Sequence, residues 1–200
     1  MTGAVLAGGK SRRMGSNKAF IEIEGESIIK RVLKVIKSVF DGTNTGTNTD
    51  SNTIIVADGV LLYEGLSTRV VADIYKGAGS LGGVYTALFH STGGYVFVAA
   101  CDMPFIDRGC IKKVIKERGG AYDAFIPFVD GRYHPMHALY SKRCMRPIES
   151  MIKEGNLRIT DLIERIRVKK LTEDDFNGLP IRASVMNINT MEELEGLKKE

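Results

Sequence analysis

The sequence predicts an α/β protein with three layers, in which helices cover both faces of a mostly parallel sheet and antiparallel strands extend that sheet. Two observations predict this class. Short apolar runs alternate along the chain with segments whose apolar residues recur every three or four positions, which is typical of strand–helix–strand units. The pair Asp130-Gly131 separates two extended runs and indicates a hairpin, and hence antiparallel strands.

The first half of the chain begins with a strand and a helix. Residues 3–7 form the first predicted strand, and residues 28–40 carry apolar side chains at helical spacing behind a Ser27 cap. This spacing predicts an amphipathic helix that packs on the sheet. Two more strands and a helix are expected, in order, at residues 53–57, 69–72 and about 81–90.

The second half contains the most apolar strand of the sequence. Residues 95–100 are uniformly apolar, which predicts a strand buried on both faces near the centre of the sheet. A helix is expected around Ile111 and Val114, and a short strand at 185–187. A last helix should start at Thr190, because Glu193 follows at the spacing of a capping box.

Composition and charge predict one domain that spans residues 1–200. Of the 200 residues 44% are hydrophobic, which is enough for one sizeable core, and no internal repeat or linker divides the chain. Residues 41–53 contain no apolar side chain and predict a polar surface loop. The net charge of +4 suits small anions and nucleic acid equally, so charge alone selects no partner.

The apolar runs are too short for a membrane protein. The longest, residues 95–101, falls far short of the ~18 residues of a transmembrane helix. The N-terminal segment is apolar first and basic only from Lys10, the reverse of a secretory signal, so we expect a cytoplasmic protein.

Cysteines and histidines show no spacing typical of a metal site or a disulfide framework. The three cysteines are odd in number and form no C-x-x-C pair, and we expect reduced core residues at Cys101, Cys110 and Cys144. The three histidines share no helical ligand spacing, and we expect core or pocket residues at His90, His134 and His137.

A glycine-rich, basic segment follows the first strand and is the densest functional signal. Residues 6–18 read LAGGKSRRMGSNK, in which Gly8-Gly9 precede four cations. Glycines let backbone N–H groups approach an anion, and lysine and arginine neutralise phosphate charge. Ligands of open α/β sheets bind at the carboxyl ends of the strands, where this segment begins. It therefore predicts a triphosphate site.

Two familiar nucleotide motifs match less well. Residues 4–11 fit a relaxed Walker A pattern, but that alignment assigns the strand residues Val5 and Leu6 to the phosphate loop. Residues 77–82 match G-x-G-x-x-G, yet four residues separate them from the strand, and an earlier strand–helix unit exists. Neither an ATPase nor a nicotinamide site is favoured.

Two acidic residues follow predicted strands and should face the same edge of the sheet. Asp102 follows the central strand and precedes Met103-Pro104, which should stop that strand. Magnesium usually takes one or two carboxylates plus substrate phosphates, so Asp102 is a candidate ligand. Asp73 follows the strand at 69–72, and its carboxylate can accept hydrogen bonds from a ribose or a base.

Taken together, the motifs resemble the molybdenum cofactor guanylyltransferases. The fold that this resemblance implies is Rossmann-like, of the nucleotide-diphospho-sugar transferase type. The matching segments occur in family order over nearly the whole chain: LAGGKSRRMGSNK at 6–18, LGGVYTAL at 81–88, CDMPFI at 101–106, HPMHALY at 134–140 and NINT at 187–190.

The resemblance implies transfer of GMP from GTP to the phosphate of molybdopterin, with Mg²⁺ as cofactor and release of pyrophosphate. Molybdoenzymes or other cofactor-biosynthesis proteins would then be partners, and neither nucleic acid nor a membrane would be. By resemblance the candidate catalytic residues are Arg13, Lys18 and Asp102. The implied nucleotide contacts are Leu6, Ala7, Gly8, Gly9, Lys18, Asp73 and Asp102, the implied metal ligand is Asp102, and Asn187 and Asn189 would lie on the pterin side.

Some positions depart from the family pattern and leave alternatives open. Ser80 stands where a proline is frequent, and Ala57-Asp58 stands where relatives often have asparagine near the nucleotide. A molybdopterin cytidylyltransferase, a sugar-phosphate nucleotidyltransferase and a GTP-binding module without catalytic activity are therefore the alternative functions.

Overall fold

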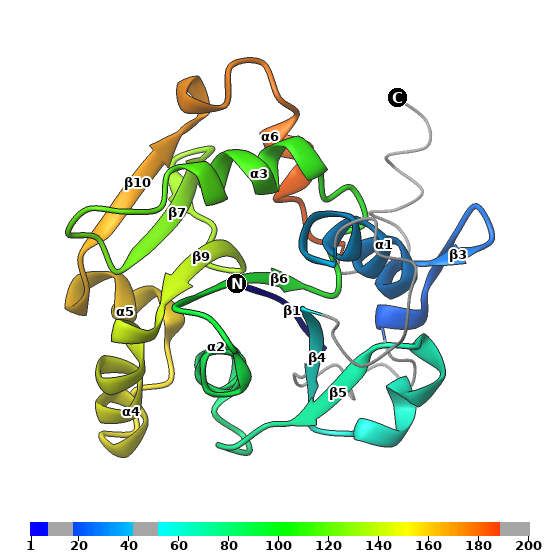
Figure 1. The fold of residues 1–200 in the computed structure, drawn as a ribbon, viewed down its shortest axis with the longest axis horizontal. Helices are drawn as coiled ribbons and strands as arrows, with labels where there is room; N and C mark the ends of the chain where they lie inside the picture. Colours follow the sequence, from blue (N-terminus) through cyan, green and yellow to red (C-terminus); the bar gives the residue numbers. More distant parts are fainter. Residues whose placement is uncertain (8–17, 42–51, 189–200) are drawn as a thin grey trace.

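The structure is a computed structural model that describes residues 1–7, 18–41 and 52–188. At its centre lies a mixed sheet with helices on both faces (Figure 1). The described strands of this sheet have the order β10-β7-β9-β6-β1-β4-β5, and β8 pairs with β7 outside that path. The predicted α/β class with a mostly parallel sheet is thus confirmed.

Most of the strands run in one direction. β6 pairs in parallel with β1, β1 with β4, and β4 with β5, whereas β9 pairs antiparallel with both β6 and β7. The bounds are β1 Thr2–Leu6, β4 Thr53–Ala57, β5 Arg69–Ala72, β6 Tyr95–Ala100, β7 Ala124–Val129, β8 Arg132–Tyr133, β9 His137–Ser141 and β10 Val168–Thr172. A separate small ribbon pairs β2 Glu22–Ile23 with β3 Glu26–Ser27.

The helices form a layer on each face of the sheet (Figure 1). One layer holds α1 Ile28–Phe40, α3 Arg108–Lys116 and α6 Ile181–Ser184. The other holds α2 Gly79–His90, α4 Met145–Lys153 and α5 Ile159–Arg165. Short 3-10 helices occur at η2 Lys18–Phe20, η3 Val60–Leu66, η4 Lys142–Cys144 and η5 Glu173–Phe176. None of the helices in the described part of the chain has the length and apolar character needed to cross a bilayer.

Strand β6 carries the core on both of its faces, as its uniformly apolar sequence predicts. Phe97 and Ala99 pack in the cluster that contains α1 and α3, and Val96 and Val98 pack in the cluster that contains α2 and α4. Its position between β9 and β1 confirms a central strand. Because close-packed side chains on both faces hold this strand in place, the position of the segment that follows it, from residue 101, is also well defined.

Helix α1 confirms the amphipathic pattern, with one difference at its cap. Ser27 occupies the N-cap position in an extended conformation, as predicted, but its hydroxyl makes no capping hydrogen bond. The reason is that Ser27 also ends β3 and is 7% exposed, so its side chain faces the interior instead of the first turn of the helix.

Two further expectations have different outcomes. The β7–β8 hairpin confirms the predicted turn, since Asp130 and Gly131 adopt φ values of 49° and 73° between paired strands.

The predicted strand at 185–187 is wrong. Val185 ends a helical turn, and Ile188 N–H donates to the Asp102 carbonyl instead of to a sheet ladder. The polar loop lies outside the described residues from 42 to 51, as does the helix predicted from Thr190.

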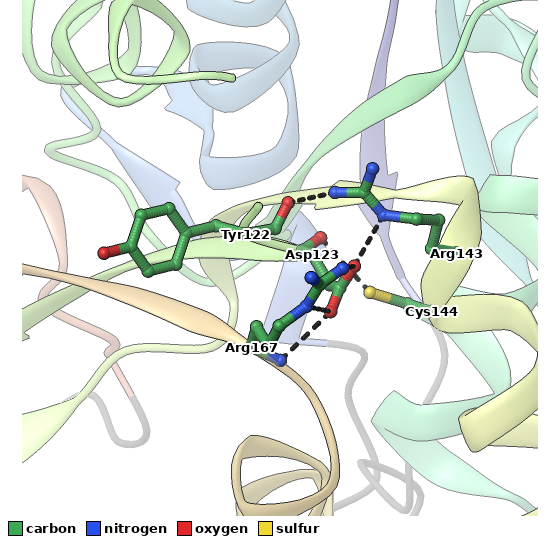
Figure 2. A network of polar contacts seen from close by, with 5 residues as sticks. All are labelled: Tyr122, Asp123, Arg143, Cys144 and Arg167. Carbon is green, nitrogen blue, oxygen red and sulfur yellow. Dashed lines mark hydrogen bonds and ion pairs between the residues drawn. The ribbon is translucent and has the colours of Figure 1, made fainter. Parts of the chain in front are cut away.

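The antiparallel end of the sheet is held by a polar network around Asp123 (Figure 2). The carboxylate of Asp123 accepts from Arg143 Nε at 2.6 Å, from Arg167 Nε at 3.0 Å and from the Arg167 backbone N–H at 3.1 Å. Arg143 also donates to the Tyr122 carbonyl, and the Cys144 thiol donates to the Asp123 carbonyl at 3.3 Å. The network joins the starts of β7 and β10 to the segment after β9.

Candidate functional site

A cavity of about 160 Å³ opens at the carboxyl ends of the parallel strands. Leu6 and Ala7 line it from the end of β1, Val56 from β4, Asp73 from the end of β5 and Asp102 from the end of β6. The start of α2 and Asn187 complete the wall. We call it the strand-end cavity. Its place agrees with the general location of ligands in open α/β sheets.

Glycines bring the first turn of α2 to this cavity. Gly79 begins the helix with φ of +59°, a conformation that side chains disfavour. A Cβ on Gly83 would lie 2.7 Å from the Cδ1 methyl of Leu6, so a larger residue there would force the Leu6 side chain to shift. Gly79 therefore serves a turn, and Gly83 a close helix contact. The N-terminal N–H groups of this helix of 12 residues favour an anion in the cavity.

Asp73 lies in an environment that disfavours its charge. Thr86 Oγ1 donates to its carboxylate at 3.1 Å and accepts from the Ile74 backbone N–H at 3.0 Å, which fixes the side chain after β5. Burial raises the pKa of Asp73 to about 6, and the nearby charge of Asp58 adds to the rise. A perturbed carboxyl group in a cavity is typical of a functional site.

Asp102 is held by backbone contacts on both sides. Cys101 N–H donates to the Leu6 carbonyl at 3.1 Å, and the Asp102 carbonyl accepts from Ile188 N–H at 2.9 Å. Cys110 and Cys144 are buried and free, as expected, whereas Cys101 is partly exposed and lines the cavity, so the expectation of a core residue is wrong at that position.

Most of the predicted site residues that the structure describes meet at this cavity. Leu6, Ala7, Asp73, Asp102 and Asn187 line it together. The backbone of Lys18, the last residue of the basic segment 6–18, begins η2. The remaining predicted site residues lie outside the described residues: Gly8, Gly9, Arg13 and Asn189.

Tyr63 supports the strand-end cavity from η3, and the sequence analysis missed it. Its hydroxyl donates to the Ala7 carbonyl at 3.0 Å, and its ring stacks on Phe20 with centroids 5.5 Å apart. Tyr63 is 1% exposed, so it fixes the end of β1 from inside the protein. No motif marks this residue, because the contact joins segments 56 residues apart.

A second cavity of about 320 Å³ adjoins the first and lies beside the β7–β8 hairpin. We call it the hairpin cavity; it shares Met136 and Asn187 with the strand-end cavity. Its other lining residues include Arg132, Tyr133, His134 and Arg182. Burial lowers the pKa of His134, whose Nε2 lies 3.2 Å from the Val129 carbonyl oxygen. Two sequence segments pointed to this second cavity, HPMHALY at 134–140 and NINT at 187–190, whose Asn187 lines it.

The comparisons with known proteins agree with this geometry. The family model described as the MobA-like NTP transferase domain matches residues 3–170. A molybdenum cofactor guanylyltransferase from Desulfosudis oleivorans is 35% identical over 98% of this chain and 93% of its own length.

Two solved structures resemble the chain over most of its length. One is the molybdopterin-guanine dinucleotide biosynthesis protein A from Archaeoglobus fulgidus, with 29% identity and a TM-score of 0.81 over 100% of this chain and 97% of that chain. The other is a protein from Aquifex aeolicus with 30% identity and a TM-score of 0.76, covering 94% of this chain and 93% of that chain. The chain therefore belongs to the MobA-like NTP transferase family.

Proposed function

We propose that the protein is a magnesium-dependent molybdenum cofactor guanylyltransferase. It transfers GMP from GTP to the terminal phosphate of molybdopterin, forms molybdopterin guanine dinucleotide and releases pyrophosphate. The observation that supports this most strongly is that two cavities adjoin and share lining residues. The strand-end cavity combines two carboxylates, Asp73 and Asp102, with the N-terminus of α2. The names of relatives at 35% identity and the motif resemblance agree with it.

The nucleotide occupies the strand-end cavity in this proposal. Backbone groups of Leu6, Ala7, Gly8 and Gly9 contact the nucleoside, and the Asp73 carboxylate accepts hydrogen bonds from it. Arg13 and Lys18 neutralise the phosphates. The N-terminus of α2, which lines the same cavity, adds a partial positive charge.

Asp102 is the proposed ligand for Mg²⁺, and its chemistry fits that ion. Carboxylate oxygens are the ligands magnesium prefers, and Asp73 lines the same cavity. In the described residues no group of three or more acidic, histidine or cysteine side chains could hold a metal ion. One carboxylate is sufficient for Mg²⁺, which usually takes its other ligands from substrate phosphates and water. When bound, magnesium would neutralise charge that develops on the phosphates.

The hairpin cavity is the proposed acceptor site. Arg132 supplies a cation at its wall, and Tyr133 and His134 supply flat rings that suit a pterin. Arg182 is largely neutralised by Glu173 at 2.6 Å and Asp130 at 3.4 Å, so Arg132 is the better candidate for an anionic group. Asn187 in the shared wall would lie between the two substrates.

The chemistry needs no nucleophilic side chain. The molybdopterin phosphate attacks the α-phosphorus of GTP, the bond to the bridging oxygen breaks, and the pyrophosphate leaves with that electron pair. The protein aligns the two phosphates and stabilises charge, which accounts for large rate effects in such transfers.

We also propose that the reaction takes place in the cytoplasm and that molybdoenzymes or other cofactor-biosynthesis proteins receive the product.

Turnover by an Asp102→Asn variant tests the proposal. The native protein should release pyrophosphate when GTP, magnesium and molybdopterin are all present. Asp102→Asn should lower that rate by about 100-fold or more, because a transition-state contact is lost while the fold stays intact. Circular dichroism and thermal melting serve as the folding control.

Three outcomes would contradict the proposal. Release with CTP but not GTP would favour the cytidylyltransferase, a choice that the Asp58 position leaves open. Turnover of a sugar phosphate would favour the sugar-phosphate nucleotidyltransferase. GTP binding without turnover would favour a binding module.

A further inference from the structure

A buried hydrogen-bonded junction lies beside both cavities without lining either of them. The backbone N–H of Asp107 donates to the Ser184 hydroxyl at 2.9 Å, and Nε2 of His137 lies 2.9 Å from the same oxygen. Ser184 and His137 are both 0% exposed. Three segments that are far apart in the sequence thus meet at one hydroxyl: the start of α3, the start of β9 and the end of α6.

The chemistry of the junction is well defined. Burial lowers the pKa of His137 to about 4, so the ring is neutral at neutral pH. A serine hydroxyl can accept from the Asp107 N–H while it shares a second hydrogen bond with a neutral imidazole. The Phe97 ring packs edge-on against the histidine with centroids 5.1 Å apart. Removal of the hydroxyl would take a hydrogen-bond partner from the fully buried His137 ring and from the partly buried Asp107 N–H, which is costly.

Each of the three segments continues into a cavity wall. His137 follows Met136, which lines both cavities, and Ser184 precedes the segment 185–187, which lines the hairpin cavity. Asp107 ends the loop that starts at Asp102. Because Ile188 N–H donates to the Asp102 carbonyl at 2.9 Å, the segment 184–188 is bonded to the loop 102–107 at both of its ends.

We propose that Ser184 is a positioning residue that sets the spacing between the two substrates. By its bonds to Asp107 and His137, it fixes the segment that carries Asn187 against the loop that carries Asp102. This inference rests on the proposed function. In-line transfer requires the attacking phosphate to lie close to the α-phosphorus, so a small displacement of one wall against the other should slow the reaction strongly.

Ser184→Ala tests the role of the hydroxyl. The variant should raise the KM for molybdopterin or lower kcat by about tenfold, because both hydrogen bonds of the hydroxyl, to Asp107 N–H and to His137, are lost. The affinity for GTP should change less than the acceptor kinetics do, because Asp73 and the N-terminus of α2 belong to segments that supply none of the hydrogen bonds of the junction. Hydrogen exchange at the amides of 185–188 should become about tenfold faster.

Ser141→Ala is the matched control. Ser141 is a buried serine on the same strand as His137, at the end of β9 that lies away from the cavities. This control should change neither the acceptor kinetics nor the exchange at 185–188.

Two substitutions of His137 separate positioning from general stability. His137→Gln keeps a polar group near the Nε2 position, so it should retain most of the native kcat and KM for molybdopterin. His137→Leu cannot bond to Ser184 and should behave like Ser184→Ala. Equal losses for GTP and molybdopterin in Ser184→Ala would overturn the inference, and so would unchanged acceptor kinetics. If the native protein does not use molybdopterin, the exchange experiment still decides whether Ser184 fixes the segment, so the two failures are distinguishable.

Discussion

At the scale of single residues, Asp73 carries its charge at a cost to the folded protein. Its pKa rises from 3.8 to about 6 on folding, so the folded state binds a proton more tightly than the unfolded chain. The stabilisation that this protonation gives is present at low pH and is lost as the pH rises from about 4 to 6. Above that range the charged carboxylate destabilises the fold.

The variant Asp73→Asn should therefore be more stable than the native protein at pH 7.5. The gain should be about 1–2 kcal/mol after allowance for solvent screening of a half-buried group, because the amide keeps an oxygen for Thr86 but carries no charge. Near pH 4 the two proteins should be equally stable. Urea unfolding at both pH values is the measurement, and a difference that does not change with pH would contradict the assigned burial.

The same residues show how far sequence reasoning reaches at this scale. Asp73 and Asp102 could be predicted because each directly follows a strand, and parallel strands end at one edge of a sheet. Ser184 could not be found in this way, because its partner Asp107 is 77 residues away in the chain. Such contacts depend on the packed tertiary structure and leave no local pattern.

At the scale of elements, the network around Asp123 should stabilise the antiparallel end of the sheet. Arg167 and, to a smaller extent, Arg143 lower the pKa of Asp123 to about 2, against the burial that raises it. Because the folded pKa lies below the unfolded value of 3.8, this stabilisation is present above pH 4. It is lost as the pH falls from about 4 to 2.

Asp123→Asn should lower the free energy of unfolding at pH 7 by about 1–2 kcal/mol, because charge-assisted bonds to two arginines are weakened. Turnover should stay unchanged, since Asp123 lies at the amino end of β7, away from both cavities. The exposed pair Glu149–Lys153 gives the control, and Glu149→Gln should leave stability almost unchanged. A loss of activity in Asp123→Asn without a loss of stability would contradict the structural role.

The failure to predict some elements from the sequence has physical reasons. β10 reads VKKLT and pairs only with β7 at the edge of the sheet, so its polar residues mask the strand pattern. The segment 185–187 was wrongly predicted as a strand because Val185 and Ile188 are apolar and buried. A pattern of apolar residues shows which side chains are buried, but not whether the backbone pairs with a strand. The segment 185–187 packs against the core without pairing with a strand.

At the scale of the whole molecule, the account depends on two cavities that share walls. The order of the motifs along the chain made the family recognisable from the sequence, and the matched family model agrees with it. The shape of the hairpin cavity could not be read from the sequence, because its walls combine β8, the loop between β8 and β9, α6 and the segment after α6. Only the folded chain brings these elements together.

The most direct test of the central claim is a competition between nucleotides. The protein is incubated with magnesium, molybdopterin and equal concentrations of GTP and CTP, and the products are identified by mass spectrometry. The account predicts molybdopterin guanine dinucleotide as the main product, together with pyrophosphate. A predominant cytosine dinucleotide, or no dinucleotide at all with a correctly folded protein, would contradict it.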